Sequence, residues 1–565
     1  MKKIKIASLC FLFALGATSC SDFLDRYPDS AIPEKDAMKT LDDCSEVVTG
    51  IYSAFKNGAL YSGPLTILPD IQADMAYAST NMGQYTAAYR WEIKPNDTDV
   101  ESIYAGLYQI VARCNFFLDY KDQVYETLTK EEDKKTFEKR LGDVYFARAL
   151  AFADLIRTFC EAYTEENKDT PDMGISLPMT YAEAVPKVKR STLYESYKQV
   201  LDDLEQAEKY IPAERSVADS PYFSIGAVNA LRARVCLYML DYEGAVKAAT
   251  KVIGSKIYTL ADATTPYATV GDTQISEYQY MWRYDEADEI IWKVAMSSDS
   301  YGGSLGNVFL NYNGATYNPQ YIFSEQILNL YESNDFRTSV FCAQQENSAG
   351  NTVYMIVKYP GNPNLDSGLQ QNFINMPKPL RLSEVYLIRA EAYYNLGKAT
   401  EASQALTALK RKRYQSFGSF SAEGEDLIKE IRNERIRELY MEGFRLSDMK
   451  RWGLDLVRKK QLYTMDGPSN NELKRTKDHP LFTRPIPKNV IEVTTGAVKG
   501  GRSNGSNNSQ YNPIIKNEET FKSSMGIAFN GIAGCRLPVG RRGIQRRRLR
   551  DVLRLYLYHA CIGRR

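Results

Sequence analysis

The sequence predicts a mainly α-helical protein, in which antiparallel helix pairs form a frame and long irregular loops form a ligand-binding face. Three observations support this fold class. Apolar residues recur at spacings of three and four along several segments, as on the buried face of a helix. Two pairs of these segments share small residues at matching positions. Long stretches rich in Tyr, Asn, Gly and Ser separate the helical parts, and loops of that length in a compact chain are usually functional.

The first long helix is expected where apolar residues follow the helical spacing from Val100 to Leu118. The residues from Thr98 to Glu101 match a capping box at its start. The oxygen-rich segment that begins at Asn96 could instead coordinate calcium, but a helix cap explains it without a metal. The same spacing predicts further helices over residues 144–159 and 193–210.

Two segments repeat one arrangement of small residues. Ala233 and Ala245 are twelve positions apart, as are Ala390 and Ala402, and an Arg-Ala pair occurs at the matching place of each first helix. Small residues let two antiparallel helices approach closely, which is the physical basis of the tetratricopeptide repeat. The sequence therefore predicts tetratricopeptide-like units near residues 144–212, 224–254, 382–413 and 425–457, the first divided by a long insertion.

The composition is that of a water-soluble globular protein. The 565 residues are 44% hydrophobic and 25% charged, which excludes a multi-span membrane protein, a collagen and a disordered chain. Tyrosine is unusually frequent, with 40 residues, whereas the chain has only two histidines. Tyrosine has an apolar ring and a polar hydroxyl, so it suits partly solvated surfaces. The shortage of histidine argues against a catalytic triad.

Charge is distributed unevenly along the chain. Residues 531–565 contain ten Arg, no Lys and one acidic residue, so a net charge of +1 for the whole chain leaves −8 on residues 1–530. An acidic body repels nucleic acid phosphates, and no nucleic acid partner is expected for it. For the Arg-rich tail, a shifted reading frame near Asn530 is the leading hypothesis, and a basic tail that binds nucleic acid or lipid is the alternative.

The first twenty residues have the pattern of a secretory signal. Three Lys residues precede an apolar stretch from Ile6 to Leu15, and small residues then lead to Cys20. A Cys at this place resembles a bacterial lipobox, which implies a signal peptide over residues 1–19 and a lipid on Cys20; an ordinary secretory leader is the alternative. Such a lipid anchors a chain to a membrane without crossing it. Five Cys of the body are expected to be buried free thiols, namely Cys44, Cys114, Cys160, Cys236 and Cys342.

Several motifs occur together in one order. The sequence Ser-Asp-Phe-Leu-Asp follows Cys20, and split tetratricopeptide units come next. The run from Glu434 to Trp452 contains Arg-Glu-Leu at 437–439 and Glu-Gly-Phe-Arg at 442–445. Together these features resemble the RagB/SusD family, with a single SusD-like domain over residues 20–530.

This resemblance implies a nutrient-uptake lipoprotein of the outer membrane, lipid-anchored and exposed at the cell surface, that is not an enzyme and needs no cofactor. It would capture an oligosaccharide or polysaccharide and deliver it to a TonB-dependent, SusC-like transporter. The alternative is a helical-repeat surface hydrolase or a peptide-binding scaffold. Among 70 acidic residues some pair always meets the spacing that glycoside hydrolysis needs, so the sequence leaves this alternative open.

The run from Glu434 to Trp452 is interpreted as one charged helix. Opposite charges stand three residues apart, for example Glu434 with Arg437 and Arg445 with Asp448. Exposed pairs of this kind stabilise a helix by about 0.2–0.5 kcal/mol each. A structural role is therefore favoured over a ligand role for these charges.

A glycan offers apolar C–H faces and a rim of hydroxyl groups, so loop aromatics with polar neighbours are the candidate contacts. Trp91 stands five residues before Asn96, and the family resemblance implies a glycan contact for such a pair, with core packing of Trp91 as the alternative. Trp282 lies among alternating aromatics that suggest a strand or extended loop. The other candidates are loop tyrosines with polar neighbours, Tyr301, Tyr312 and Tyr317.

Overall fold

The computed structural model describes residues 36–500, except for 80–82, 182–187, 213–219, 348, 367–372, 466, 470–471 and 495–499. One compact unit extends from Met38 to Ile514. The predictions for the signal peptide, for Cys20 and for the Arg-rich tail lie outside the described residues. Within the described part of the chain, no helix is long and apolar enough to cross a membrane.

Four long helices form the first half of the frame. Helix α5 contains the predicted segment, but its N-cap is Asp97, whose carboxylate accepts hydrogen bonds from the backbone of Asp99 and Val100. The predicted capping box one residue later is therefore wrong. Helix α6 packs against both α5 and α7, and α2 packs against α5 and α6. Their bounds are α2 (Leu41–Ala54), α5 (Thr98–Tyr125), α6 (Glu131–Phe159) and α7 (Leu193–Tyr210).

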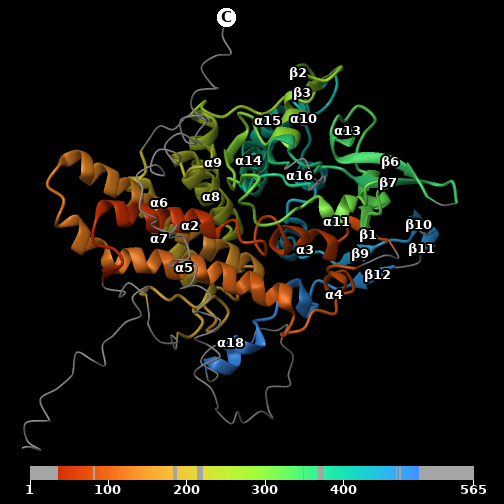
Figure 1. Cartoon of the computed structure of the whole chain (residues 1–565). Coiled ribbons are helices and arrows are strands. Elements are labelled where there is room, and N and C mark those ends of the chain that lie inside the picture. Colours follow the sequence, from red (N-terminus) through yellow and green to blue (C-terminus); the bar gives the residue numbers. More distant parts are fainter. Residues whose placement is uncertain are drawn as a thin grey trace, which may run out of the picture. The chain divides into compact units, whose positions relative to one another are not determined.

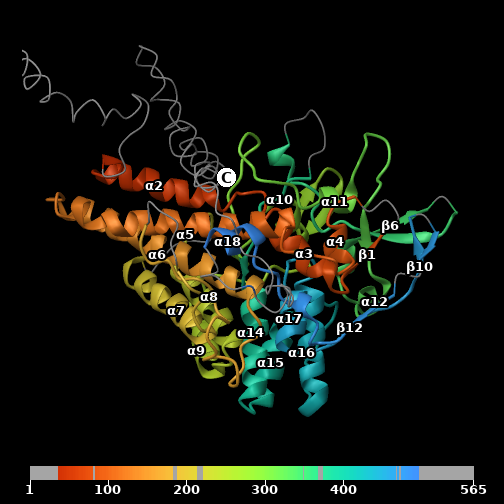
Figure 2. The same cartoon turned by 90° about the horizontal axis from the view of Figure 1, so that it is seen from below.

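Two helix pairs of the predicted kind follow, α8 (Ile225–Tyr238) with α9 (Tyr242–Gly254) and α14 (Leu382–Asn395) with α15 (Ala399–Lys410). Helix α14 also packs against α8 and α9, so the two pairs stack although about 130 residues separate them. The four alanines at the repeated positions are all fully buried, which confirms their predicted packing role: Ala233, Ala245, Ala390 and Ala402. Figures 1 and 2 show α8 and α9 beside α7, with α14 next to them.

The predicted charged helix is broken in two. Helix α16 (Gly424–Glu438) ends before Gly443, where the backbone has a positive φ of 82°, and α17 (Arg445–Arg451) begins after it. A side chain added to Gly443 would clash with the backbone of Thr66, so the break lets α17 approach α3 (Pro64–Gln72). Helix α17 packs against α3, whereas α16 packs against α14 and α15.

The charges of this region are buried, contrary to the prediction of exposed pairs. The expected pair between Glu434 and Arg437 is present at 2.8 Å. The expected pair between Arg445 and Asp448 is replaced, because Arg445 binds Asp74 at 2.7 Å and Asp448 binds Arg435 at 2.7 Å.

A small antiparallel sheet occupies segments for which the sequence predicted irregular loops. Its strand order is β1-β5-β7-β6, with Tyr77 opposite Ile322 and Ile322 opposite Met355. Tyr77, Ile322 and Val353 form its buried core. In both views the strands lie at the end of the unit away from α6 and α7 (Figures 1 and 2). The strands are β1 (Ala76–Ala78), β5 (Tyr321–Phe323), β6 (Cys342–Glu346) and β7 (Thr352–Ile356).

Short elements complete the described structure. The remaining helices are α4 (Thr86–Tyr89), α10 (Glu277–Tyr284), α11 (Asn307–Leu310), α12 (Glu325–Leu328), α13 (Thr338–Phe341), α18 (Lys488–Val493), η3 (Pro363–Leu365) and η4 (Pro480–Phe482). The remaining strands are paired in twos and comprise β2 (Pro266–Val270), β3 (Thr273–Ser276), β4 (Ile290–Trp292), β8 (Leu380–Arg381), β9 (Leu456–Arg458), β10 (Gln461–Thr464), β11 (Gly467–Ser469) and β12 (Leu473–Arg475). The five body cysteines are free; four are buried and Cys342 is half-buried.

Candidate functional site

Two of the predicted tyrosines lie together on one loop between α11 and β5, which we call the tyrosine hairpin (residues 311–318). Asn311 ends α11 in the left-handed region, with φ at 42°, and its side-chain amide donates to the carbonyl of Asn318 at 2.8 Å. Across the hairpin, Tyr312 and Tyr317 face each other as an isolated antiparallel bridge. The loop chemistry of Asn and Gly residues therefore closes the hairpin and brings the two rings together.

The rings of the tyrosine hairpin form a ready-made aromatic surface. The ring centroids of Tyr312 and Tyr317 are 4.8 Å apart at an interplanar angle of 40°. The Tyr312 side chain is 36% exposed, and its hydroxyl donates to the carbonyl of Gly314 at 2.9 Å. Asn313 accepts hydrogen bonds from the backbone of Ala315 and Thr316, both at 3.0 Å, which fixes the turn. Fixed rings lose little conformational freedom when a ligand stacks on them.

One glutamine from a neighbouring strand contacts the hairpin. The side-chain amide of Gln345, on β6, donates to the carbonyl of Tyr317 at 3.4 Å. Its Oε1 atom is buried and has no hydrogen-bond partner in the described part of the chain. After the hairpin, Gln320 accepts from the backbone of Gln84 at 2.8 Å, and the hydroxyl of Tyr321 donates to the carbonyl of Gln84 at 2.7 Å. One amide therefore lies beside the aromatic pair.

Tyr301 lies on a separate loop and is 50% exposed. This loop is held by Lys56, whose ammonium donates to the Ser300 hydroxyl at 2.6 Å, and by the close approach of Gly302 to the Lys56 carbonyl. Among the described residues, no ring contact links Tyr301 to Tyr312 or Tyr317. Tyr301 is an accessible aromatic, and it is not part of the tyrosine hairpin.

Trp282 is a core residue, contrary to the prediction that it contacts ligand. It lies on helix α10 instead of a strand or loop, because Ser276 and Gln279 form a capping box that starts the helix. The side chain is 2% exposed, so no sugar ring can stack on it. Three buried cations surround its ring: the Nζ atoms of Lys358 and Lys378 lie 4.1 and 4.9 Å from the centroid, and the Cζ of Arg381 lies 5.1 Å from it.

The cations around Trp282 belong to a buried ion network. Arg381 contacts Glu289 at 2.5 Å, Glu438 at 3.1 Å and Glu442 at 2.6 Å, and Lys358 contacts Glu442 at 2.7 Å. Burial alone would raise the pKa of Glu438, but the guanidinium groups of Arg413 and Arg381 hold this pKa well below its usual range. Burial lowers the pKa of Lys358 to about 8, and the nearby carboxylate of Glu442 opposes this shift. This buried ion network is thus structural support in the core.

Trp91 is also a core residue, as the core-packing alternative predicts. Its side chain is 4% exposed, and its indole N–H donates to the carbonyl of Gln72 at 2.7 Å. The rings of His479 and Phe482 lie 5.1 and 4.9 Å from its ring, in edge-to-face contact. Asn96 is exposed next to the Asp97 cap, so the two residues of the predicted Trp–Asn pair differ in accessibility.

No group of three or more His, Cys, Asp or Glu side chains in the described residues is arranged to hold a metal ion. The calcium alternative for residues 96–101 therefore has no such cluster to support it, and Asp97 serves as a helix cap.

Comparisons with known proteins agree with this architecture. Residues 258–525 match the model described as the SusD family, and residues 22–237 match the model described as starch-binding associating with outer membrane. The chain belongs to the SusD family. Its resemblance to that family, predicted from the motifs, is thereby confirmed. SusD family members are carbohydrate-binding proteins and not enzymes, which also confirms the prediction that this chain is not an enzyme.

Individual relatives within the SusD family are distant. SusD-like protein P38 of Formosa agariphila is 23% identical over 86% of this chain and 97% of its own length. A putative sugar binding protein from Bacteroides vulgatus has a similar fold, with a TM-score of 0.68 and 22% identity over 81% of this chain and 98% of that chain. A SusD superfamily protein from Bacteroides thetaiotaomicron also gives a TM-score of 0.68, at 24% identity and with the same coverage. These likenesses confirm the mainly α, SusD-like fold class.

The sequence reasoning missed Gln345, the glutamine beside the tyrosine hairpin. It lies 28 positions from Tyr317, and no local pattern connects the two residues. The one available signal was the strand-like stretch from Thr352 to Ile356, which forms β7. This strand pairs with β6, which carries Gln345, and with β5, which follows the hairpin.

Proposed function

We propose that this protein is a cell-surface, glycan-binding lipoprotein that captures an oligosaccharide and delivers it to a TonB-dependent, SusC-like transporter in the outer membrane. The tyrosine hairpin is the observation that carries the binding part of the proposal. Membership of the SusD family and the matched model for outer-membrane association support the location.

The chemistry of the tyrosine hairpin fits a sugar better than other ligands. The exposed ring of Tyr312, with the half-buried ring of Tyr317 beside it, suits the apolar C–H face of a pyranose ring. Among the described residues, no cation–π contact or ion pair involves either tyrosine, which favours a neutral ligand over a charged peptide end. We also propose that Tyr301 and Asn96, which are both exposed, contact the glycan.

Calorimetric titration tests the binding proposal. The mature chain carrying Cys20→Ala, which cannot be lipidated, is titrated with plant, microbial and host glycans. For the glycan that binds, Tyr317→Ala is expected to weaken affinity about 2–10-fold, the equivalent of the roughly 0.5–1.5 kcal/mol of an aromatic contact. Tyr194→Ala is the control, because Tyr194 is an accessible tyrosine that lies on α7 in the helical frame.

Two results would contradict the binding proposal. Equal affinity of the Tyr317→Ala and Tyr194→Ala variants would remove the tyrosine hairpin from the site. Release of reducing sugar from a bound glycan would favour the surface hydrolase instead.

Anchoring and delivery need a separate test in cells. Labelling with a fatty-acid analogue is expected to mark the wild-type protein and to be lost in Cys20→Ala, because the acyl chains attach at that residue. Affinity purification from outer membranes is expected to recover a TonB-dependent transporter with the wild-type chain. Recovery of the chain alone, in detergents that preserve such complexes, would refute the delivery step.

A further inference from the structure

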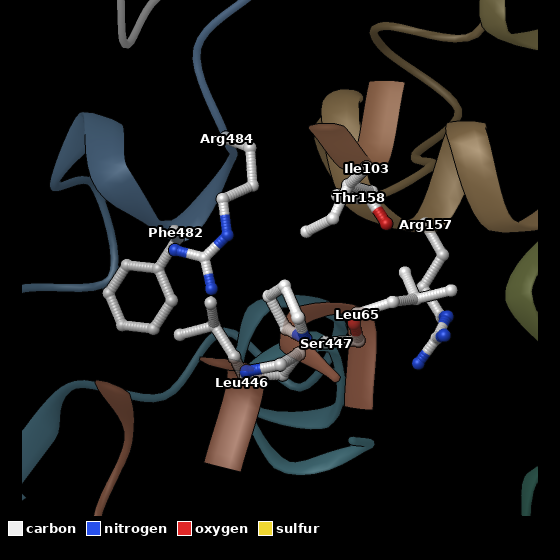
Figure 3. A pocket seen from close by; sticks show the side chains of 10 residues that line it. Leu65, Ile103, Arg157, Thr158, Leu446, Ser447, Phe482 and Arg484 are labelled. Atoms are coloured by element: carbon white, nitrogen blue, oxygen red, sulfur yellow. The ribbon is translucent and has the colours of Figure 1, made fainter. Parts of the chain in front are cut away.

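A small pocket lies where five elements meet, far in sequence from the tyrosine hairpin. It has a volume of about 20 Å³ and lies between α3, α5, α6, α17 and η4. Figure 3 shows Arg484 and Phe482 on one side and Arg157 on the other, with Ile103 and Leu446 between them. A volume of roughly 10–15 Å³ holds one water molecule, so the pocket can accept a single small species.

Arg484 is a buried cation that forms no salt bridge with a carboxylate of the described residues. It is only 4% exposed, its backbone N–H donates to the carbonyl of Thr158 at 3.0 Å, and its Nη1 donates to the side-chain oxygen of Gln72. Its Nη2 is buried and has no hydrogen-bond partner in the described residues. A buried guanidinium normally has every N–H satisfied, because an unmade hydrogen bond from a charged donor is costly.

The groups around the pocket add positive charge. The second arginine of the lining, Arg157, is already paired with Asp154 at 3.0 Å, but its Nε is buried and has no hydrogen-bond partner among the described residues. Lys450 is half-buried and donates to the carbonyls of Arg157 and Cys160, at 3.1 and 2.6 Å. Among the described residues, neither Lys450 nor Arg484 forms a salt bridge with a carboxylate.

Two acids near Arg484 form no salt bridge with it in the described part of the chain. The carboxylates of Asp97 and Asp99 stabilise its charge at longer range, and the Asp97 carboxylate also caps α5. Burial lowers the pKa of Arg484 to about 10, and these two carboxylates oppose the shift without cancelling it. Burial likewise lowers the pKa of Lys450 to about 8; Cys160 and Glu161 oppose this shift, whereas Arg157 and Arg484 add to it. Burial is the main cause of both shifts, so they show that the two cations are removed from water.

We propose that this pocket is a binding site for a small monovalent anion such as chloride, held by Arg484 Nη2. A water molecule would satisfy the free N–H but would leave the charge of Arg484 without a counterion. An anion satisfies both. Arg484 anchors the segment after η4 to the end of α6, so the anion would hold the C-terminal part of the fold against the frame.

Thermal unfolding of the mature chain carrying Cys20→Ala provides the test. Sodium chloride is compared with sodium gluconate at constant ionic strength, since gluconate is too large for the pocket. Chloride is expected to raise the Tm in a saturable manner, because an ion that binds only the folded state stabilises it. Arg484→Met is expected to abolish this chloride dependence. Lys488→Met, which removes an exposed cation four residues away, is expected to keep it.

A second measurement covers the case in which Arg484→Met does not fold. Crystals of the unsubstituted mature chain grown in sodium bromide are expected to show an anomalous peak beside Arg484 Nη2. A water molecule at that place, with no anomalous signal, would overturn the proposal. So would a Tm that responds equally to chloride and gluconate.

Discussion

The tyrosine hairpin and the surroundings of Trp282 use the same kind of side chain for opposite purposes. At the hairpin, the ring of Tyr312 is exposed and the ring of Tyr317 is half-buried; the two lie 4.8 Å apart, with the neutral amide of Gln345 beside them. Around Trp282, one ring is enclosed by three cations, and those cations are neutralised by buried carboxylates. The difference teaches that an aromatic residue in a loop-like sequence indicates binding only when its neighbours leave its face accessible. Removing the hairpin rings should therefore affect binding, whereas removing Trp282 should affect folding.

The largest expected effect is the loss of stability in Trp282→Ala. This change leaves a cavity and removes the ring between Lys358, Lys378 and Arg381, so we expect a loss of about 3–5 kcal/mol in the free energy of unfolding. Urea denaturation measures it. Below the unfolding transition, glycan affinity should equal that of the wild type. A stable variant that no longer binds glycan would reverse the assignment of the two regions.

Low pH is expected to weaken the buried ion pairs near Trp282 more than it affects the tyrosine hairpin. Burial alone would raise the pKa of Glu434, but Arg337 and Arg437 lower this pKa to about 2. Because the folded pKa lies below the unfolded value, Glu434 contributes stability above about pH 4.5, and this contribution is lost as the pH falls towards 2.

Denaturation of Glu434→Gln at pH 7 and pH 3 checks this sign. We expect the variant to be about 3 kcal/mol less stable than wild type at pH 7, with a smaller deficit at pH 3. Glu208→Gln is the control, since Glu208 makes only partly exposed pairs with Arg232 and Lys251, which contribute about 0–1 kcal/mol. An equal loss of unfolding free energy at both pH values would show that the negative charge of Glu434 does not stabilise the fold.

The smallest expected effect on stability is at the hairpin itself. Tyr312→Phe removes the hydroxyl that bonds to Gly314 but keeps the ring, and the site is exposed. We expect the free energy of unfolding to change by less than about 0.5 kcal/mol and glycan affinity to be retained. Urea denaturation and calorimetry on the same preparation measure both. A large loss of affinity would mean that the hydroxyl, and not the ring face, contacts the sugar.

The helical frame was predictable because its signals are local. The spacing of apolar residues located α5, and the limits predicted for α7 are those observed, Leu193 to Tyr210. The twelve-residue spacing from Ala233 to Ala245 indicated a tight helix pair, which α8 and α9 form. The four-stranded sheet was missed, because its strands are three to five residues long and their partners lie far apart in the chain.

The candidate site was predictable only in part. Asn and Gly residues beside Tyr312 and Tyr317 indicated a loop with accessible rings, and the structure places both rings on one hairpin. Trp282 carried the same aromatic pattern, but Ser276 caps a helix there and the fold buries the ring.

The sequence by itself determined the helical frame, the family and the residue types available for binding, because periodicity, small residues and motifs act over a few turns of helix. Only the tertiary structure decided which aromatics are exposed and which charges are buried. It placed Arg381 among Glu289, Glu438 and Glu442, and it left Arg484 beside a pocket without a carboxylate. These outcomes depend on contacts between residues tens to hundreds of positions apart, and burial, unlike helical spacing, is a property of the whole fold.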